Sequence, residues 1–304
     1  MSYISQDLAI DCDSSIAIVA HDAGAANLIL GWICERQHEN LRFCVSGPAA
    51  DIFQRWRPLL CNTDIDSAIR DAGLLISGTS ASSIDLEHQA RLRAKQIGVR
   101  SVGVIDHWVN YEQRFVRHGE LLLPDEIWVS DEFAASIACA CFPSQLVRRI
   151  NNYFLDAQVQ SIAVKTEKKS DRELLHVLYL LEPIKESWGR EGVPGEMQAL
   201  NFFVQNRSLV GIGENAQIRL RPHPSEAPEK YTGWCMQHEE LKIDVDCTGT
   251  LADLIAWSDV VVGCQTAAMV IALHAKRQVI SVMPPWAPAC ALPHEGIKML
   301  RDLL

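Results

Sequence analysis

The stretch SSIAIVAHDAGAANLILGWICERQ (Ser14–Gln37) determines the fold that we expect. Its first seven residues form a short apolar run rich in β-branched side chains, which predicts a buried strand. A turn of small residues follows, HDAGAAN, and then an apolar segment typical of a helix. The sequence thus predicts a strand, a loop at the carboxyl end of that strand, and a helix, which together make one βα unit.

The same order of strand and helix recurs along the first half of the chain. Apolar runs predict strands at residues 41–47, 73–80, 101–106 and 126–131, and helical segments lie at 49–56, 83–98 and 132–142. Strands that are apolar along their whole length and alternate with helices are typical of a parallel sheet covered on both faces. We therefore expect a doubly wound α/β domain.

A charged stretch, AVKTEKKSDRE, has no apolar periodicity and predicts a linker. A second α/β series follows it. Its predicted strands cover residues 174–181, 217–222, 241–246, 259–263 and 278–285, and its predicted helices cover 197–205, 250–258, 266–276 and 295–304. We expect an N-terminal Rossmann-like domain (1–155), a linker (156–172) and a C-terminal Rossmann-like domain (173–304) that ends in a helix. Two doubly wound sheets of this kind should face each other across a cleft, with ligand-binding loops at the carboxyl ends of the strands.

The composition argues against several classes of function. A net charge of -10, from 38 acidic and 28 basic residues, disfavours nucleic acid or an anionic membrane as the main partner. The ten scattered cysteines are typical of reduced thiols, and the close pair Cys139 and Cys141 has no second pair at ligand spacing, so we expect no metal site and no cofactor. No signal peptide and no apolar run of about 18 residues is evident. We expect a cytoplasmic protein without a transmembrane segment, or one peripheral to the inner face of the membrane.

The first polar motif, His21 to Asn27, follows the first predicted strand. Small residues here let the backbone approach a ligand, and the next helix offers free N–H groups to an anion. The spacing is not GxGxxG, so a dinucleotide site is weakly supported. His21 and Asp22 are candidates for acid–base chemistry, and Gly24 and Asn27 for substrate binding. The alternative is that this motif is only a helix start, in which Asp22 or Asn27 caps the helix and the alanines serve packing.

Two further polar motifs follow strands of the same domain. GTSASS (78–83) brings Thr79 and Ser80 to a helix start, where the hydroxyls cap the helix or hold hydroxyl groups of an acceptor. In DHWVNY, Asp106 and His107 supply an acid and an imidazole beside a large aromatic ring. Both are candidates for a catalytic base, and the alternative is a buried pair that braces the loop.

The strand predicted over QIRLRP ends at a histidine between two prolines. Arg219, Arg221 and His223 share one face of an extended strand, because side chains alternate with period two. Two guanidinium groups and an imidazole that converge form a clamp for phosphate. Ser225 and Glu226 are neighbouring candidates for binding. The alternative is that the arginines are solvated and the prolines only end the strand.

A second anion site is predicted some forty residues later, in VVVGCQTAAMVIAL. A buried strand ends at Gly263 and a helix begins near Thr266. The helix N–H groups and the Thr266 hydroxyl can hold a phosphate, with Gln265 beside them. This helix start and the RPHP motif lie on neighbouring units of one domain, and together they are the most specific signal in the chain.

The chain resembles glycosyltransferases of the GT-B architecture, in which two Rossmann-like domains face each other and the C-terminal one holds the activated sugar. His223-Pro224 and the GCQTAA helix start resemble the His-Pro and Ser/Thr motifs of bacterial sialyltransferases, polysialyltransferases and capsule-type Kdo transferases. RPHP is also similar to the glycerophosphotransferases of teichoic-acid synthesis. The resemblance implies that His223 and Thr266 contact the donor phosphate, with Arg221 and Gln265 as neighbours. The acidic motif that carries the base in sialyltransferases is absent as such, and HDAG is its nearest analogue.

This resemblance implies a metal-independent glycosyltransferase. It would move a sugar from a nucleotide-activated donor, CMP- or UDP-linked, to a glycan or glycolipid acceptor in surface polysaccharide synthesis. Asp22 by preference, or Asp106 or His107 otherwise, would deprotonate the acceptor, while His223 and Arg221 meet the charge of the leaving phosphate. The alternatives are a sugar-nucleotide epimerase or hydrolase of the same fold, and a non-catalytic sugar-nucleotide binding protein. Fold analogy does not separate these three.

Overall fold

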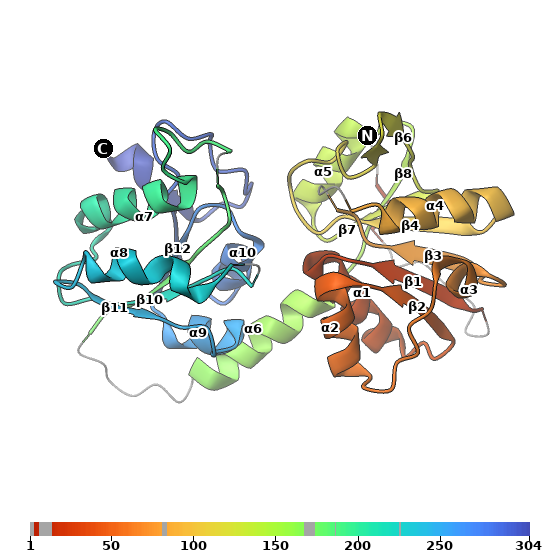
Figure 1. Ribbon diagram of the computed structural model, residues 1–304, viewed down its shortest axis with the longest axis horizontal. Coiled ribbons are helices and arrows are strands. Elements are labelled where there is room, and N and C mark those ends of the chain that lie inside the picture. The colour runs from red at the N-terminus through yellow and green to blue at the C-terminus, as the bar shows by residue number, and fades with distance from the viewer. Residues whose placement is uncertain (1–2, 6–13, 81–83, 167–173, 186, 225) are drawn as a thin grey trace. The chain divides into compact units, whose positions relative to one another are not determined.

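The structure is a computed structural model that describes residues 3–5, 14–80, 84–166, 174–185, 187–224 and 226–304. The chain divides into two compact units, residues 1–154 and 155–304, which we call unit 1 and unit 2 (Figure 1). Each unit is built on a six-stranded sheet whose strands all run parallel.

The sheet of unit 1 has the strand order β2-β1-β3-β4-β7-β8. Its strands are β1 (Ile16–Ala20), β2 (Leu41–Val45), β3 (Leu74–Ser77), β4 (Arg100–Val104), β7 (Glu126–Val129) and β8 (Leu146–Arg149). Strands β1 and β3 are buried at every position, as expected for apolar strands in the middle of a covered parallel sheet.

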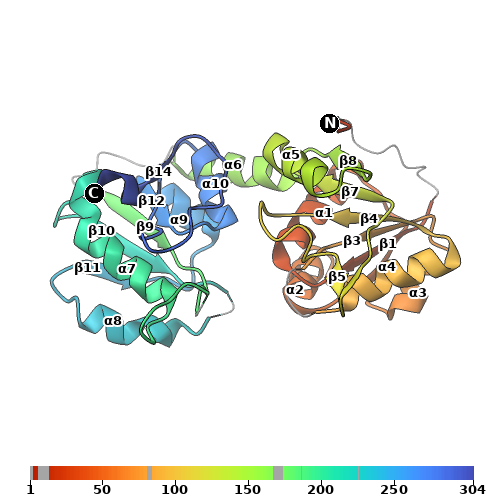
Figure 2. The ribbon, with the colours of Figure 1, turned by 90° about the horizontal axis from the view of Figure 1, so that it is seen from above.

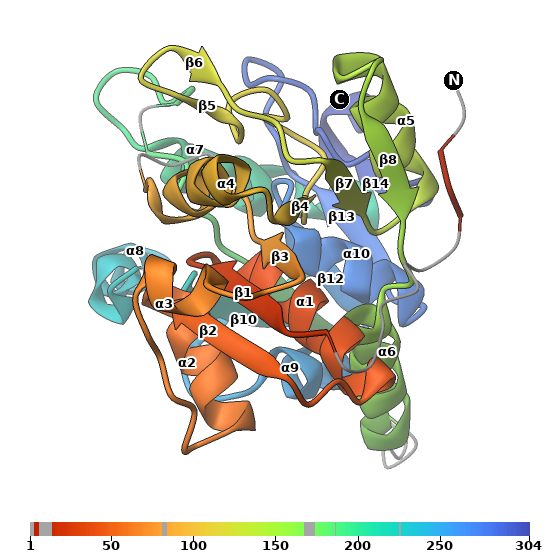
Figure 3. The ribbon, with the colours of Figure 1, turned by 90° about the vertical axis from the view of Figure 1, so that its right-hand side faces the viewer.

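Helices cover both faces of this sheet, as Figures 2 and 3 show. Helices α1 (Ala23–Arg36) and α2 (Gly47–Trp56) pack against the face that carries Ile16 and Ile18. Helices α3 (Ile65–Ile69) and α4 (Leu86–Ile97) pack against the other face, which carries Ala17 and Val19. The unit is completed by α5 (Glu132–Cys141) and by a small hairpin, β5 (Val116–Arg117) and β6 (Glu120–Leu121).

The sheet of unit 2 has the order β11-β10-β9-β12-β13-β14. Its strands are β9 (His176–Leu180), β10 (Gln217–Arg221), β11 (Lys242–Val245), β12 (Val260–Gly263), β13 (Gln278–Ser281) and β14 (Ile297–Met299). Counted from the first strand of the unit, this order is 3-2-1-4-5-6, the order typical of dinucleotide-binding Rossmann folds.

The main core of unit 2 lies on one face of its sheet, under α7 (Gly195–Asn206) and α8 (Thr232–Met236). Tyr179, Leu220 and Val262 are among its fully buried members. Helix α9 (Leu251–Trp257) connects β11 to β12, which are separated in the sheet by β10 and β9, and α10 (Ala267–His274) connects the neighbouring strands β12 and β13. Three 3₁₀ helices, η1 (Arg207–Val210), η2 (Pro228–Tyr231) and η3 (Leu300–Leu303), complete the described part of this unit.

The prediction of two doubly wound parallel sheets is confirmed. The predicted C-terminal helix over 295–304 is wrong, because Ile297–Met299 forms the edge strand β14 beside β13 and only a 3₁₀ turn follows. Pairing with a neighbouring strand here outweighs the helical periodicity of the segment. The segment 156–172, for which we predicted a linker, begins with most of α6 (Tyr153–Thr166), and 167–173 lies outside the described residues. In α6 only Ile162 is buried, which explains the weak apolar pattern.

Candidate functional site

The strand order of each sheet reverses at one point, between β1 and β3 in unit 1 and between β9 and β12 in unit 2. Loops that leave the carboxyl ends of two such strands diverge to opposite faces and form the usual ligand site of doubly wound folds. The polar motifs of the sequence lie at these points. His21 and Asp22 follow β1, residues 78–80 follow β3, and residues 264–266 follow β12.

Asp22 occupies the N-cap position of α1 in an extended conformation, yet its side chain makes no capping hydrogen bond. The carboxylate instead contacts the imidazole of the preceding residue, with 2.7 Å between His21 Nδ1 and Asp22 Oδ1. The side chains of His21 and Asp22 are 22% and 38% exposed. The pair is therefore accessible, and the expected capping role of Asp22 is absent. Asn27 lies half-buried one turn further along α1.

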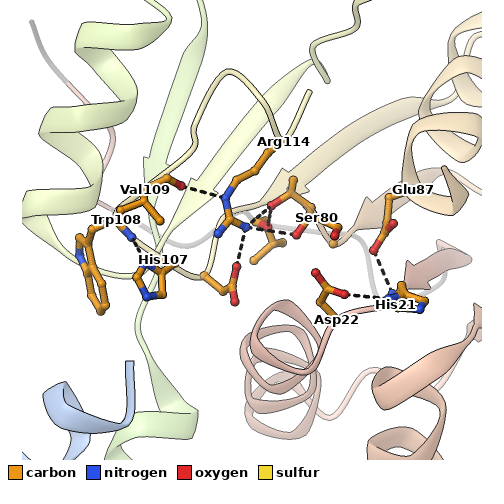
Figure 4. A network of polar contacts seen from close by, with 12 residues as sticks. His21, Asp22, Ser80, Glu87, His107, Trp108, Val109 and Arg114 are labelled. Atoms are coloured by element: carbon orange, nitrogen blue, oxygen red, sulfur yellow. Dashed lines mark hydrogen bonds and ion pairs between the residues drawn. The ribbon is translucent and has the colours of Figure 1, made fainter. Parts of the chain in front are cut away.

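Glu87, in the first turn of α4, points toward the His21 turn, as Figure 4 shows. Its Oε1 accepts a hydrogen bond of 2.9 Å from the main-chain N–H of His21. Its Oε2 is buried and has no hydrogen-bond partner within the described part of the chain. Burial raises the pKa of Glu87, and the negative charge of Asp22 adds to this shift. The imidazole of His21 rests on Gly47, where a Cβ would lie 2.5 Å from Nε2 and φ is +53°.

Asp106 lies against the first turn of α1. A Cβ on Gly24 would lie 1.7 Å from Asp106 Oδ2, so only glycine allows this approach. The other oxygen, Oδ1, accepts a 2.7 Å hydrogen bond from Arg114 Nη1 in a charge-assisted pair. Arg114 is 7% exposed and also donates to the carbonyl and hydroxyl oxygens of Thr79. Asp106 is thus held by a buried arginine.

The remaining predicted residues of unit 1 have internal partners. Thr79 is fully buried, and its hydroxyl donates to the Val104 carbonyl over 2.8 Å. Ser80 is also buried, and its carbonyl accepts from Arg117. His107 Nδ1 accepts from the main-chain N–H of Trp108 and is aimed back at its own loop (Figure 4). The Asp22 carboxylate is more accessible than that of Asp106, because the two side chains are 38% and 20% exposed.

In unit 2, Arg219 and Arg221 share one face of β10, while Ile218 and Leu220 point into the core, as period two requires. Arg219 stacks its guanidinium 4.1 Å from the centroid of Trp257 and lies 3.7 Å from Asp246. Arg221 Nη1 donates to the Gly249 carbonyl over 2.7 Å. The first arginine is therefore anchored within the unit, and the second is half-buried at the carboxyl end of the strand.

His223 lies beyond the end of β10 and is exposed, although partial desolvation lowers the pKa of its imidazole. Ser225 lies outside the described residues. The side chain of Glu226 is buried and belongs to an internal network: it accepts 2.8 Å and 2.5 Å hydrogen bonds from Tyr231 and Lys230, and Lys230 also pairs with Glu196. The network fixes the loop after β10 against α7.

Thr266 is the N-cap residue of α10, and its hydroxyl accepts from the N–H of Ala268. Gln265 Oε1 accepts from the N–H of Ala291 over 3.1 Å. The N–H groups of Cys264 and Gln265 donate to a carboxylate of the protein itself: Glu182 Oε1 lies 3.1 Å and 2.7 Å from them. The N–H groups that precede α10 thus already bind a carboxyl group of the protein.

Burial raises the pKa of Glu182 to about 7, against the opposing effect of the N–H groups at the start of α10. A carboxyl group that follows the central strand of unit 2 therefore changes charge near neutral pH. Sequence reasoning did not single out Glu182, although its position directly after an apolar strand is a usable signal. Glu87 and Arg114 were also missed, because a helix-start glutamate and a loop arginine have no distinctive pattern.

Among the described residues, no group of three or more histidine, cysteine, aspartate and glutamate side chains is arranged to hold a metal ion. Likewise, none of the helices described has the length and apolar character needed to cross a membrane. Nine cysteines are described, and all nine are free thiols.

No protein-family model and no curated protein sequence matches the chain. Solved structures do match it. UDP-GlcNAc 2-epimerase from Methanocaldococcus jannaschii aligns with 88% of this chain and 83% of its own, at 10% identity and a TM-score of 0.56. A putative UDP-N-acetylglucosamine 2-epimerase from Listeria monocytogenes aligns with 88% and 79%, at 11% identity and a TM-score of 0.56. The chain has the GT-B fold.

A variant of the wall teichoic acid polymerase TagF is also similar, with 88% of this chain and 70% of that chain aligned, 12% identity and a TM-score of 0.50. At such identities the likeness extends to the GT-B fold and no further. Because enzymes with different printed activities share that fold, the reaction has to be argued from the residues themselves.

Proposed function

We propose that the protein is a metal-independent glycosyltransferase that moves a sugar from a nucleotide-activated donor to a hydroxyl group of a glycan or glycolipid. The observation that carries the proposal is the His21–Asp22 pair: Asp22 stands at a helix N-cap without capping the helix, and its carboxylate is partly exposed at the carboxyl end of β1. A helix end that forgoes its own cap loses about 1 kcal/mol of stability. Asp22 Oδ2 has no partner among the residues described and is free to accept a proton.

The residues of unit 1 have distinct roles in this proposal. Asp22 Oδ2 takes the proton from the acceptor hydroxyl as its oxygen attacks the anomeric carbon. His21 orients the carboxylate through its Nδ1–H, and Glu87 fixes the His21 main chain. Asp106, which is paired with Arg114 and packed against Gly24, shapes the loop rather than moving the proton.

The residues of unit 2 stabilise the leaving group. As the bond from the sugar to the donor phosphate breaks, negative charge grows on the phosphate oxygen, and positioned donors favour that change. Arg221 and His223 at the end of β10 provide two of these donors. The N–H groups at the start of α10 provide the others once Glu182 no longer accepts hydrogen bonds from them. The His223-Pro224 pair resembles the motif of enzymes with cytidine-linked donors, so CMP- and CDP-linked sugars are the first donors to test.

Two experiments test this function. Thermal unfolding with CMP, CDP, UDP, GDP and their sugars should show stabilisation by at least one of them, since a ligand that binds the folded state raises its apparent stability. With that donor, His223→Ala should lose turnover with an unchanged fold, and Asp22→Asn should lose turnover while still binding donor. Full turnover by either variant refutes the assignment, and a lack of response to every nucleotide counts against the whole proposal.

A sugar-nucleotide hydrolase or epimerase is the second candidate. It is favoured by the grouping of three carboxyl side chains, Asp22, Glu87 and Asp106, around the start of α1 in unit 1, because several acids at one site suit activation of water or proton abstraction. Release of free sugar and nucleotide, or of the 2-epimer, in the absence of any acceptor distinguishes this candidate from a transferase. If the donor is still intact after long incubation with acceptors, both enzymatic functions are excluded and only a binding function remains.

A further inference from the structure

A tight turn brings Arg190 to the start of α7. Glu191 and Gly192 both have positive φ, of 55° and 73°, and the flanking residues Arg190 and Val193 form an antiparallel bridge. Two consecutive positive φ values are typical of the type I′ turn. Gln198 Nε2, one turn into α7, donates to the carbonyls of Arg190 and Val193 over 2.8 Å and 3.0 Å. The hairpin is therefore fastened to the helix.

Trp286 lies in the segment PPWAPACALP after β13, and its indole ring is held from several sides. The indole N–H donates to Gln198 Oε1 over 2.9 Å, and Phe202 contacts the ring edge-on with centroids 6.1 Å apart. Arg190 Nη2 donates to the Trp286 carbonyl over 3.2 Å. Arg301 donates to the carbonyls of Pro285, Ala287 and Pro288, on both sides of the tryptophan.

Despite these contacts, 39% of Trp286 remains exposed. An aromatic ring that is fixed but uncovered binds a flat partner with little loss of entropy, because its conformation is already set. Arg190 is also an exposed residue, and among the residues described its side chain forms no ion pair with a carboxylate. It provides N–H donors beside the ring.

The Trp286 segment is joined to the start of α10. Ala291 N–H donates to Gln265 Oε1, and the thiol of Cys290 lies 3.5 Å from the Cys264 carbonyl. Strands β12 and β13 are neighbours in the sheet and run parallel, so their following loops leave from the same edge. The exposed ring and the predicted phosphate contacts thus lie on connected loops of one unit.

We propose that Trp286 and Arg190 form the subsite for the donor nucleobase, with the base stacked on the indole ring and a carbonyl oxygen of the base bound by the Arg190 guanidinium. This rests on the proposed function, because it takes the donor to be a nucleotide. It selects cytosine, uracil or guanine over adenine, since adenine carries no carbonyl oxygen for arginine to bind. Gln198 is a positioning residue that holds the indole ring without touching the base.

Calorimetric titration of the full chain with CDP, UDP, GDP, ADP and inorganic pyrophosphate tests the proposal. Trp286→Ala should weaken binding of the best nucleotide about tenfold or more, the loss typical of a stacked base, and leave pyrophosphate binding unchanged. Trp286→Phe keeps a flat ring and should bind within about threefold of the wild type. Quenching of tryptophan fluorescence by the nucleotide should be lost in Trp286→Phe even though binding persists.

A matched control is Phe133→Ala in unit 1, which removes an aromatic ring that is 41% exposed and should leave nucleotide binding unchanged. Arg190→Ala should reduce the preference of the wild type for CDP, UDP or GDP over ADP. Circular dichroism confirms that each variant is folded.

The outcomes separate the two proposals. If the wild type binds a nucleotide and Trp286→Ala binds it equally well, the base subsite is refuted and the proposed function stands. Loss of pyrophosphate binding in Trp286→Ala also refutes the subsite, because the ring would then support the phosphate contacts. If the wild type binds no nucleotide, both proposals fail.

Discussion

Replacing Glu182 with glutamine should stabilise unit 2 in a way that depends on pH. Glutamine keeps an oxygen in place to accept from the N–H groups of Cys264 and Gln265, so the contacts at the start of α10 are retained. The variant removes only the ability to ionise. Its effect therefore isolates the free energy of charging a desolvated carboxyl group beside a helix N-terminus.

The magnitude follows from two pKa values. Burial raises the pKa of Glu182 from 4.5 to about 7 on folding, so the folded state holds the proton over a range in which the unfolded state has lost it. The stability linked to this proton is fully present below pH 4.5 and is lost as the pH rises through 7. Linkage places the loss at roughly 2–3 kcal/mol between about pH 5 and about pH 8. The glutamine variant avoids this loss.

The ionisable neighbours of Glu182 do not change charge in this pH range. Tyr179, Cys264 and Cys290 interact electrostatically with Glu182. Burial raises the pKa of Tyr179 and of both thiols above their ordinary values, so these three groups stay neutral from pH 5 to pH 8. The pH dependence of the difference between variant and wild type should therefore report Glu182 alone.

Urea unfolding at both pH values, with hydrogen exchange of the β9 and β12 amides to assign the change to unit 2, provides the measurement. The free energy of unfolding of Glu182→Gln should exceed that of the wild type by roughly 2 kcal/mol more at pH 8 than at pH 5. Glu295→Gln, at an exposed position of the same unit, is the control and should show no such difference. An equal effect at the two pH values, or destabilisation at pH 8, refutes the reasoning.

Three further variants test unit 1. Gly24→Ala should lower the melting temperature, with a cost of about 1–2 kcal/mol that exceeds the usual helix gain of alanine, because the new Cβ would displace the Asp106 carboxylate. Arg114→Met should lower the free energy of unfolding in urea by about 2–3 kcal/mol, because it leaves Asp106 and a Thr79 oxygen without their hydrogen-bond donor. Adding Asp106→Asn should recover part of this loss, and a double variant that shows no recovery contradicts the pairing. Asp22→Asn should reduce kcat about 100-fold or more with donor affinity retained, whereas a change confined to KM argues against a base.

The fold was largely readable from the sequence because the central strands carry their own signal. β1, β3 and β12 are apolar at nearly every position and are bounded by small or polar residues. This pattern is typical of strands covered on both faces. The edges were harder. β8 has the sequence LVRR, and its two arginines remove the apolar pattern that would have predicted a strand. The strand β14 forms because it pairs with β13, and local propensity does not include that neighbour.

The candidate site could be predicted only in part. The sequence placed His21, Asp22 and Asp106 at strand ends, and parallel topology explains why these ends share one edge. Partners from distant segments were not readable, since Glu87 reaches His21 across 66 positions and Glu182 reaches Gln265 across 83. Such pairs depend on tertiary structure. They also decide whether a polar residue is free for a ligand or already bound within the protein.

The carboxyl group at the start of α10 makes ligand binding a proton-exchange event. If a phosphate settles beside Glu182, the second negative charge raises the carboxyl pKa further and protons are taken up from the buffer at neutral pH. If the phosphate instead displaces Glu182 into water, the carboxyl returns toward its ordinary pKa and protons are released. Binding heats measured in buffers of different ionisation enthalpy report the direction of proton flow. The sign of that exchange thus tells whether Glu182 stays with the ligand or leaves.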